Sequence, residues 1–257
     1  MTQRRKGEWE KGSIQIALSP FLHFIPYLFY PSPICVICVL IEGETMENLM
    51  KSADEIRAAF DVKNAARDKA LVTSREAIRF CANSIRSIHR GEYAEADVLL
   101  REAQNRVCAT ADELKCCPDI YHAGYVQDAQ KEYVEASTVK AIMRDLPIPT
   151  HQELGVEEAP YLNGLAEAVS ECRRDVLDIL RRGDMDRAVH IMQTMDDIFS
   201  VLCTFDYPDG ITGGLRRTMD QTRAVLERTR GDLTITIRQR ELEKALNKAV
   251  EVFEGKA

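Results

Sequence analysis

Two glutamates stand one helical turn apart where a packed helix normally presents apolar side chains. They are Glu132 and Glu135, in the stretch KEYVEAS of residues 131–137. The line through residues 125–142 that carries them advances by three and four residues in turn, which is the spacing of one helix face, and Asp128 lies on the same line. Burying an unpaired carboxylate costs several kcal/mol, and neighbouring carboxylates repel each other. This face must therefore either lie in water or be neutralised by cations.

A second acidic pair, Glu167 and Glu171, lies within the stretch PYLNGLAEAVSECRR. The two residues share a helix face, which continues through Arg174 and Asp178 as ordinary polar surface. If the two acidic faces pack against each other, four carboxylates would form a hard-oxygen site suited to Mg²⁺ or Mn²⁺. Periodicity alone leaves both interpretations open, because paired glutamates in a chain with 29% charged residues are usually solvated.

The elements that position these acids are predicted to be helices. An S-x-x-E capping box at Ser52 and Glu55 indicates the start of a long first helix that runs to about His89. Pro160 favours the start of the helix that carries the second acidic pair and ends near Gly183. Apolar periodicity predicts the other helices at residues 93–114, 119–145, 188–202 and 215–255.

One segment favours a different structure locally. Residues 233–237, LTITI, alternate and are rich in β-branched side chains, which favours a strand. A single strand has no partner in this sequence, so a helix is expected here as well. The predicted fold is all-α, a bundle in which one or two helices exceed the globular average and leave side surfaces for self-association.

The first forty-five residues differ from the rest. Residues 12–41 contain no Asp, Glu, Lys or Arg and follow a basic cluster, but prolines at positions 20, 26, 31 and 33 interrupt any helix. We expect residues 1–45 to be an extension outside the fold, from a misassigned start, with a hydrophobic membrane anchor as the alternative. Residues 46–257 are expected to form one helical domain with no membrane contact.

Charge and cysteine usage limit the class of protein. The net charge of −7 means that any nucleic-acid binding must come from a local basic surface. Most of the cysteines beyond the first forty residues occupy apolar helix positions, like small hydrophobic residues in a reducing compartment. A cytoplasmic location is therefore expected.

Four segments resemble the translin family, in the same order along the chain. KEYVEAS resembles the QEYVEA motif of translin-associated protein X, the nuclease-bearing branch, and YLNGLAEAVSE resembles that branch's YLLGVADLTGE. RRGDMDRAVHIMQTMDDIF is similar to the G-D-x-x-R-P-x-H-I pattern of translin, and LRRTMDQTRAVLERTRGDLTITIR resembles the family's C-terminal helix. The resemblance covers roughly residues 52–240.

This resemblance implies a seven-helix fold that assembles into a hollow homo-oligomer, usually an octamer, whose nuclease-bearing branch is a hydrolase that cuts RNA with Mg²⁺. Glu132 and Glu135 match the motif glutamates, and Glu171 matches a neighbouring Glu. Glu167 falls where Asp is usual, so its arm is longer by one methylene and the metal geometry there is in question. The resemblance therefore implies that Glu132, Glu135 and Glu167 are catalytic and that, with Glu171, they hold Mg²⁺, with Mn²⁺ as the alternative ion.

The expected partner is RNA, single-stranded or a short duplex, with single-stranded DNA as a further candidate. Basic residues near the motifs are candidates for phosphate contact, namely Arg187, His190, Arg181, Arg182 and Lys131. They also fit a satisfied helix histidine and solvated surface arginines. The alternative function is a translin-like protein that binds single-stranded RNA or DNA without cutting it, and a helical scaffold with no ligand stays open. A ferritin-like oxidase is excluded because the sequence lacks its Glu-x-x-His pairs.

Overall fold

The computed structural model describes residues 33–255 of the chain. By its contacts the chain divides into two units, residues 1–55 and residues 56–257, and both acidic pairs lie in the second. The predicted extension over residues 1–45 and its membrane-anchor alternative lie mostly outside the described residues. Within the described part, no helix combines the length and the apolar character needed to cross a membrane.

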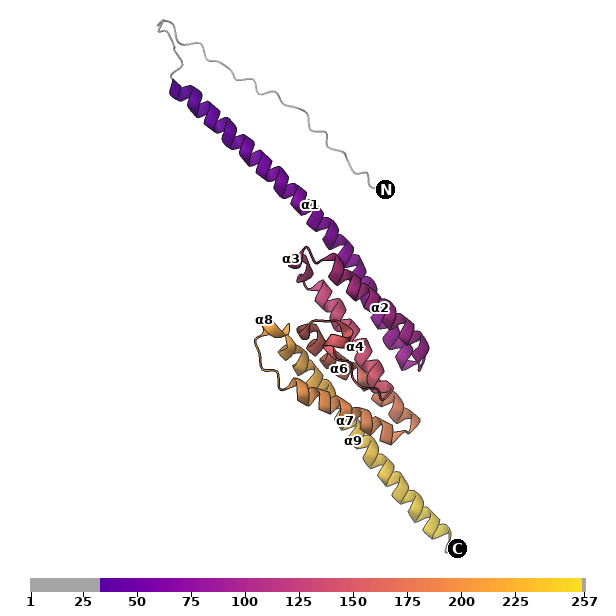
Figure 1. The fold of residues 1–257 in the computed structure, drawn as a ribbon. Coiled ribbons are helices and arrows are strands. Elements are labelled where there is room, and N and C mark those ends of the chain that lie inside the picture. Colours follow the sequence, from indigo (N-terminus) through magenta and orange to yellow (C-terminus); the bar gives the residue numbers. More distant parts are fainter. Residues whose placement is uncertain (1–32, 256–257) are drawn as a thin grey trace, which may run out of the picture. The chain divides into compact units, whose positions relative to one another are not determined.

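The described residues form helices and no strands, which confirms the predicted all-α fold. Figure 1 shows the order of these helices. The resemblance to the translin family implied seven helices, and the described residues form six long helices and three short ones. The long helices are α1 (Pro33–His89), α2 (Tyr93–Glu113), α4 (Tyr125–Met143), α6 (Glu158–Arg182), α7 (Met185–Leu202) and α9 (Leu215–Glu254). Three short helices of four residues each join them, α3 (Pro118–Tyr121), α5 (His151–Leu154) and α8 (Asp209–Thr212).

The expected helix at LTITI is confirmed, because this segment lies inside α9 and Leu233 is buried there. The start of the first helix was predicted wrongly. α1 already begins at Pro33, so the Ser52–Glu55 box lies inside the helix and does not cap it. Once a helix is nucleated, each further residue adds a hydrogen bond, and good helix formers upstream of the box let it continue.

The third predicted helix, over residues 119–145, was also wrong as one continuous element. It is divided into α3 and α4 by a turn at residues 122–124. Gly124 has a φ of 98°, which residues with a side chain rarely adopt, and it caps the start of α4. The acidic face of residues 132–135 therefore belongs to a helix that begins only seven residues earlier, at Tyr125.

The core of the second unit is built around α6, which contacts α4, α7, α8 and α9. Its residues Ala166, Val169, Cys172 and Val176 are completely buried and recur at helical spacing along one face. Facing them, α4, α7 and α9 each contribute fully or almost fully buried apolar side chains, including Val134, Val139, Ile191, Met195 and Leu226. Packing against this shared core fixes the position of α4 relative to α6.

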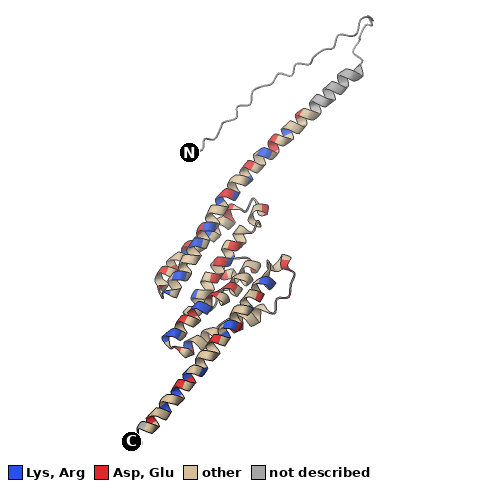
Figure 2. Cartoon of the chain, turned by 180° about the vertical axis from the view of Figure 1, so that it is seen from behind, with Lys and Arg blue, Asp and Glu red and all other residues tan. Residues whose placement is uncertain are grey.

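The end of α9 has a different character. Its last turns carry large apolar side chains that are half exposed or more, namely Leu242, Leu246, Val250 and Phe253. Basic and acidic residues both lie between them, and Figure 2 shows both colours along this helix. Apolar area exposed in a row is typical of a surface that another protein covers.

At Gly164, α6 lies directly against the backbone of α4. A methyl group on residue 164 would lie 2.6 Å from the carbonyl oxygen of Lys131 and 2.7 Å from the Cβ of Val134. Both distances are shorter than any ordinary van der Waals contact, so only a hydrogen atom fits there. Because residues 131 and 134 flank Glu132, and Glu167 follows Gly164 by less than one helical turn, this contact brings the two acidic faces together.

We therefore expect Gly164→Ala to lower the free energy of unfolding by about 1–3 kcal/mol, the usual cost of overpacking. Urea denaturation followed by circular dichroism measures this change. Gly231→Ala is the matched control, because residue 231 is an exposed position inside α9 with open space around it. There the better helix propensity of Ala should raise the free energy of unfolding by about 0.5–1 kcal/mol. Equal effects of the two substitutions would contradict the close-approach argument.

Candidate functional site

The two acidic pairs meet where α4 packs against α6. Glu132 and Glu135 come from α4 and Glu167 comes from α6, and one carboxylate oxygen from each lies within 4.8 Å of the others. We call these three residues the glutamate cluster. All three side chains are partly buried. The structure thus brings together three of the four acids that the sequence suggested. The acidic faces of α4 and α6 pack against each other, so the interpretation of two solvated faces does not hold for these three residues.

Burial and mutual repulsion make the ionised cluster unfavourable. Removal from water is the largest cause that raises the pKa of Glu135, and the charges of Glu132, Glu167 and Glu171 add to it, so that this pKa reaches about 8. Burial, followed by the charge of Glu167, also raises the pKa of Glu132. Both shifts show that the cluster lacks enough positive charge nearby to balance its carboxylates.

The ammonium group of Lys131 forms an ion pair with one member of the cluster. Its Nζ donates a hydrogen bond to Glu167 Oε1 over 2.8 Å, and the side chains of both residues are about one-third exposed or less. One ammonium group against three carboxylates leaves the site net negative. Hard carboxylate oxygens at this spacing suit a divalent cation such as Mg²⁺, so the residues present fit the metal that the sequence resemblance implied.

Glu171 is held differently from the cluster. Its Oε1 accepts a hydrogen bond from His89 Nε2 over 2.8 Å, and the other ring nitrogen, Nδ1, lies 2.9 Å from Asp175 Oδ1. These two hydrogen bonds, with Asp175 the larger contribution, raise the pKa of His89 to about 9 against the effect of burial. The same bond to His89 lowers the pKa of Glu171. Glu171 is thus ionised and paired, unlike Glu135.

Sequence reasoning missed His89 and Asp175. His89 was read only as the end of a helix, and Asp175 did not stand out among the charged residues of α6. The two residues are 86 positions apart, so no local spacing connects them. The only available signal was that Asp175 lies four residues after Glu171 on the same helix face.

Arg187 and His190 belong to α7, and Arg187 contacts the C-terminal end of α4. Arg187 donates from Nη2 to the carbonyl oxygens of Ile142, over 3.1 Å, and Met143, over 2.8 Å, and its Nη1 pairs with Asp145. His190 Nε2 lies 3.1 Å from the same Asp145 carboxylate. Arg187 therefore binds carbonyl groups at the end of α4, where the last carbonyls have no partner one helical turn further on. Phosphate contact by these two residues stays a prediction.

The remaining predicted contacts, Arg181 and Arg182, are exposed at the end of α6. Arg181 pairs with Asp178 over 3.1 Å, and its side chain is 83% exposed. An ion pair this exposed is weak, so it leaves the guanidinium group accessible to a phosphate. The guanidinium groups of Arg181 and Arg182 are thus exposed, whereas that of Arg187 is held by its carbonyl and carboxylate partners.

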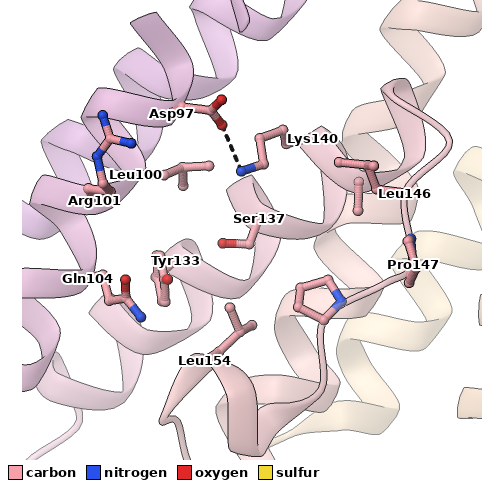
Figure 3. A pocket seen from close by; sticks show the side chains of 12 residues that line it. Asp97, Leu100, Arg101, Gln104, Tyr133, Ser137, Lys140, Leu146, Pro147 and Leu154 are labelled. Carbon is pink, nitrogen blue, oxygen red and sulfur yellow. Dashed lines mark hydrogen bonds and ion pairs between the residues drawn. The ribbon is translucent and has the colours of Figure 1, made fainter. Parts of the chain in front are cut away.

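The opposite face of α4 borders a separate pocket of about 310 Å³. Figure 3 shows Tyr133, Ser137 and Lys140 of α4 on one side of it and residues of α2 on the other, with Lys140 bonded to Asp97. Leu146, Pro147 and Leu154 close it from the segment after α4. The residues that line this pocket do not include the glutamate cluster, so the two sites use different faces of one helix.

Comparison with known proteins gives consistent results. No family model matches the chain. The chain is 32% identical over 188 residues to the uncharacterized protein MJ0175 of Methanocaldococcus jannaschii, a match that covers 72% of this chain and 83% of that relative.

Solved structures are similar over nearly their whole length. The crystal structure of AfC3PO superposes with a TM-score of 0.64 and 32% identity, over 73% of this chain and 97% of that one. AfC3PO in complex with duplex RNA gives a TM-score of 0.63 and 31% identity, over the same shares of the two chains. Apo-NeC3PO gives 0.65 at 22% identity, over 71% of this chain and 96% of that one, which supports the fold alone.

The raised pKa of Glu135 predicts a pH-dependent effect of Glu135→Gln in EDTA. A carboxyl group whose folded-state pKa, about 8, exceeds the unfolded value binds its proton more tightly in the folded state. The wild type therefore loses stability as the pH rises from about 4.5 to about 8, and the variant lacks the part of this loss that comes from residue 135. We expect the melting temperature of the variant to exceed that of the wild type by about 2–4 °C or more at pH 9, and by less at pH 5.

Thermal unfolding followed by circular dichroism over this pH range checks the prediction. Glu158→Gln is the matched control, because Glu158 lies exposed in the first turn of α6. Its difference from the wild type should stay constant with pH. A constant difference for Glu135→Gln as well would show that the Glu135 carboxyl group titrates normally.

Proposed function

Because the chain belongs to the translin family, on the branch that includes translin-associated protein X and the C3PO proteins, we propose that it is a Mg²⁺-dependent endoribonuclease. The proposed substrate is single-stranded RNA or a short duplex, cut inside a translin-like oligomer. The observation that carries the proposal is the glutamate cluster, in which Glu132, Glu135 and Glu167 converge from two helices within 4.8 Å. A protein that only bound phosphate groups would gain nothing from carboxylates gathered in this way.

Each residue of the site has a distinct part in the proposal. Glu132, Glu135 and Glu167 would hold the cation, which supplies a lowered pKa for an attacking water and stabilises charge on the phosphate. Glu167 has a longer side chain than the usual aspartate, and the bond from Lys131 fixes its Oε1. Glu135, whose pKa burial and the neighbouring carboxylates raise to about 8 when no cation is bound, would lose its proton on binding the cation, because the positive charge favours the carboxylate form.

RNA as the ligand class is supported by a neighbour. AfC3PO, 31% identical to this chain, has been solved in complex with duplex RNA. The same structure favours a second candidate function, RNA binding without cleavage, because it demonstrates binding and leaves the reaction open. In either case phosphate contacts fall to exposed cations, and the chain offers Arg181 and Arg182 at the end of α6.

Assembly into a homo-oligomer is part of the proposal, with eight copies as the number that the family resemblance implies. The half-exposed apolar side chains of Leu242, Leu246 and Val250 near the end of α9 support self-association. Covering them with a second copy would remove apolar area from water at about 25 cal/mol per Å².

The test of the function is cleavage of end-labelled RNA by the full chain with Mg²⁺, with Mn²⁺, or with EDTA. We expect cutting of single-stranded or short duplex RNA only with a divalent cation, and a loss of about 100-fold or more in rate for Glu135→Gln, because a carboxylate ligand of the cation is removed. Glu158→Gln, which makes the same chemical change outside the cluster, should keep the wild-type rate. RNA that is retarded on a gel but stays intact, equally for all three proteins, would favour the binding protein.

The basic residues separate into two groups in a second test. We expect Arg181→Ala with Arg182→Ala to weaken RNA retention several-fold at low salt and to reduce the slope of log affinity against log salt, without changing the melting temperature. Arg187→Ala should lower the melting temperature, because it removes the side-chain donor to the carbonyls of Ile142 and Met143 and the ion pair with Asp145. Filter binding and thermal unfolding of the same preparations distinguish the groups. Weaker retention by Arg187→Ala at an unchanged melting temperature would instead assign that residue to the RNA.

A further inference from the structure

His89 is a buried side chain that links the site to the end of α1. Its side chain is only 4% exposed, yet both ring nitrogens are bonded to carboxylates of α6. Nε2 lies 2.8 Å from Glu171 and Nδ1 lies 2.9 Å from Asp175. An imidazole ring that donates from both nitrogens holds its two acceptors at a fixed separation, because the ring is rigid.

The two acceptors are held to different degrees. Asp175 is 7% exposed, and its second oxygen, Oδ2, is buried without a hydrogen-bond partner among the described residues. Glu171 is about one-third exposed, and only its Oε1 meets His89. Asp175 is thus the fixed end of this bridge, and Glu171 is the end that reaches toward the cluster.

Glu171 follows Glu167 by four residues in α6, which is about one helical turn, so its carboxyl group comes from the same helix face as a member of the glutamate cluster, although it lies outside the group of oxygens within 4.8 Å. Its Oε2 accepts no hydrogen bond from the part of the chain that the structure describes. We propose that His89 is a positioning residue, which holds Glu171 Oε1 so that Oε2 is left to complete the set of cation ligands beside the cluster. This inference rests on the proposed function, since it concerns the same site.

The physical basis is preorganisation. A free glutamate side chain loses rotamer entropy when it is ordered. A ring that already holds one oxygen reduces this loss on cation binding, because the carboxylate is fixed before the ion arrives. Groups that orient metal ligands in this way typically change metal affinity by about 10–100-fold when they are removed.

Two substitutions of His89 separate its two bonds. The amide nitrogen of Asn occupies nearly the place of Nδ1, so His89→Asn keeps the bond to Asp175 and loses the bond to Glu171. The amide nitrogen of Gln occupies nearly the place of Nε2, so His89→Gln keeps the bond to Glu171 and loses the bond to Asp175. Titration calorimetry with Mn²⁺ measures cation affinity of the full chain, and thermal unfolding in EDTA measures stability.

We expect His89→Asn to weaken Mn²⁺ binding about tenfold or more, and His89→Gln to stay within about threefold of the wild type. Stability should follow the opposite order, because only His89→Gln leaves the buried Asp175 unpaired. A purely structural role would move both readouts in the same order. Mn²⁺ affinity of His89→Asn equal to that of the wild type, or equal losses for both variants, would overturn the inference.

A further variant covers the case in which the His89 substitutions do not fold. Glu171→Ala leaves His89 and Asp175 bonded to each other, and we expect it to weaken Mn²⁺ binding about tenfold or more. In a Glu171→Ala background His89→Asn should then add no further loss, as a double-mutant cycle requires. Unchanged affinity of Glu171→Ala would overturn the inference alone. A wild-type protein that does not bind Mn²⁺ would overturn the proposed metal site and the inference with it.

Discussion

The separation between α4 and α6 is the constraint on which the site depends. It is set at Gly164, where only a hydrogen atom fits against the Lys131 carbonyl and the Val134 side chain. A larger residue would push apart the very turns that carry Glu132 and Glu167. The buried apolar face of α6, with Ala166, Val169 and Cys172, holds the helices together through the shared core. Small residues at the contact therefore decide how close the carboxylates come, and close carboxylates are what gives the site its chemistry.

That closeness opposes folding in the absence of a cation. Packing of apolar side chains forces carboxylates into partial burial, and this burial, followed by repulsion between the carboxylates, raises the pKa of Glu135 to about 8. The protein reduces the conflict in two ways, with Lys131 bonded to Glu167 and with His89 bonded to Glu171. Each cation neutralises a residue of α6 and leaves the α4 pair exposed to the repulsion. The site is therefore most strained at Glu132 and Glu135, the pair that lies on the packed stripe of its helix.

Much of this arrangement could be predicted from the sequence, because helical periodicity is a local property. The spacing of Glu132 and Glu135 placed them on one helix face, whereas only the resemblance to the translin family implied that Glu167 joins them. The prediction from the sequence was wrong where a short local motif and a longer pattern of helix-forming residues indicated different helix boundaries. A capping box at Ser52 is a valid helix start in isolation, but continuing helix upstream made it an interior segment. Gly124 broke a helix that apolar spacing alone joined together.

Residues that act through distant partners lay beyond sequence reasoning. His89 meets Glu171 across 82 positions, and no pattern near His89 distinguishes it from any histidine that ends a helix. Arg187 shows the converse, since a basic residue in a family motif suggested phosphate, while the structure gives it carbonyl and carboxylate partners at the end of α4. Residue type indicated the charge correctly in both cases. Only the packing of α1, α4, α6 and α7 showed what each charge faces.

The long sequence span of the site also has a consequence for synthesis of the chain. α4 leaves the ribosome with its two glutamates well before α6 has been made, and His89 precedes both. Until residues 167–175 have been added, the nascent chain holds two neighbouring acids with neither the third carboxylate nor the partners of His89. The site thus cannot exist on a chain that ends before α6. Its assembly coincides with the packing of α6 against α4, and α7 and α9 complete the core around that pair afterwards.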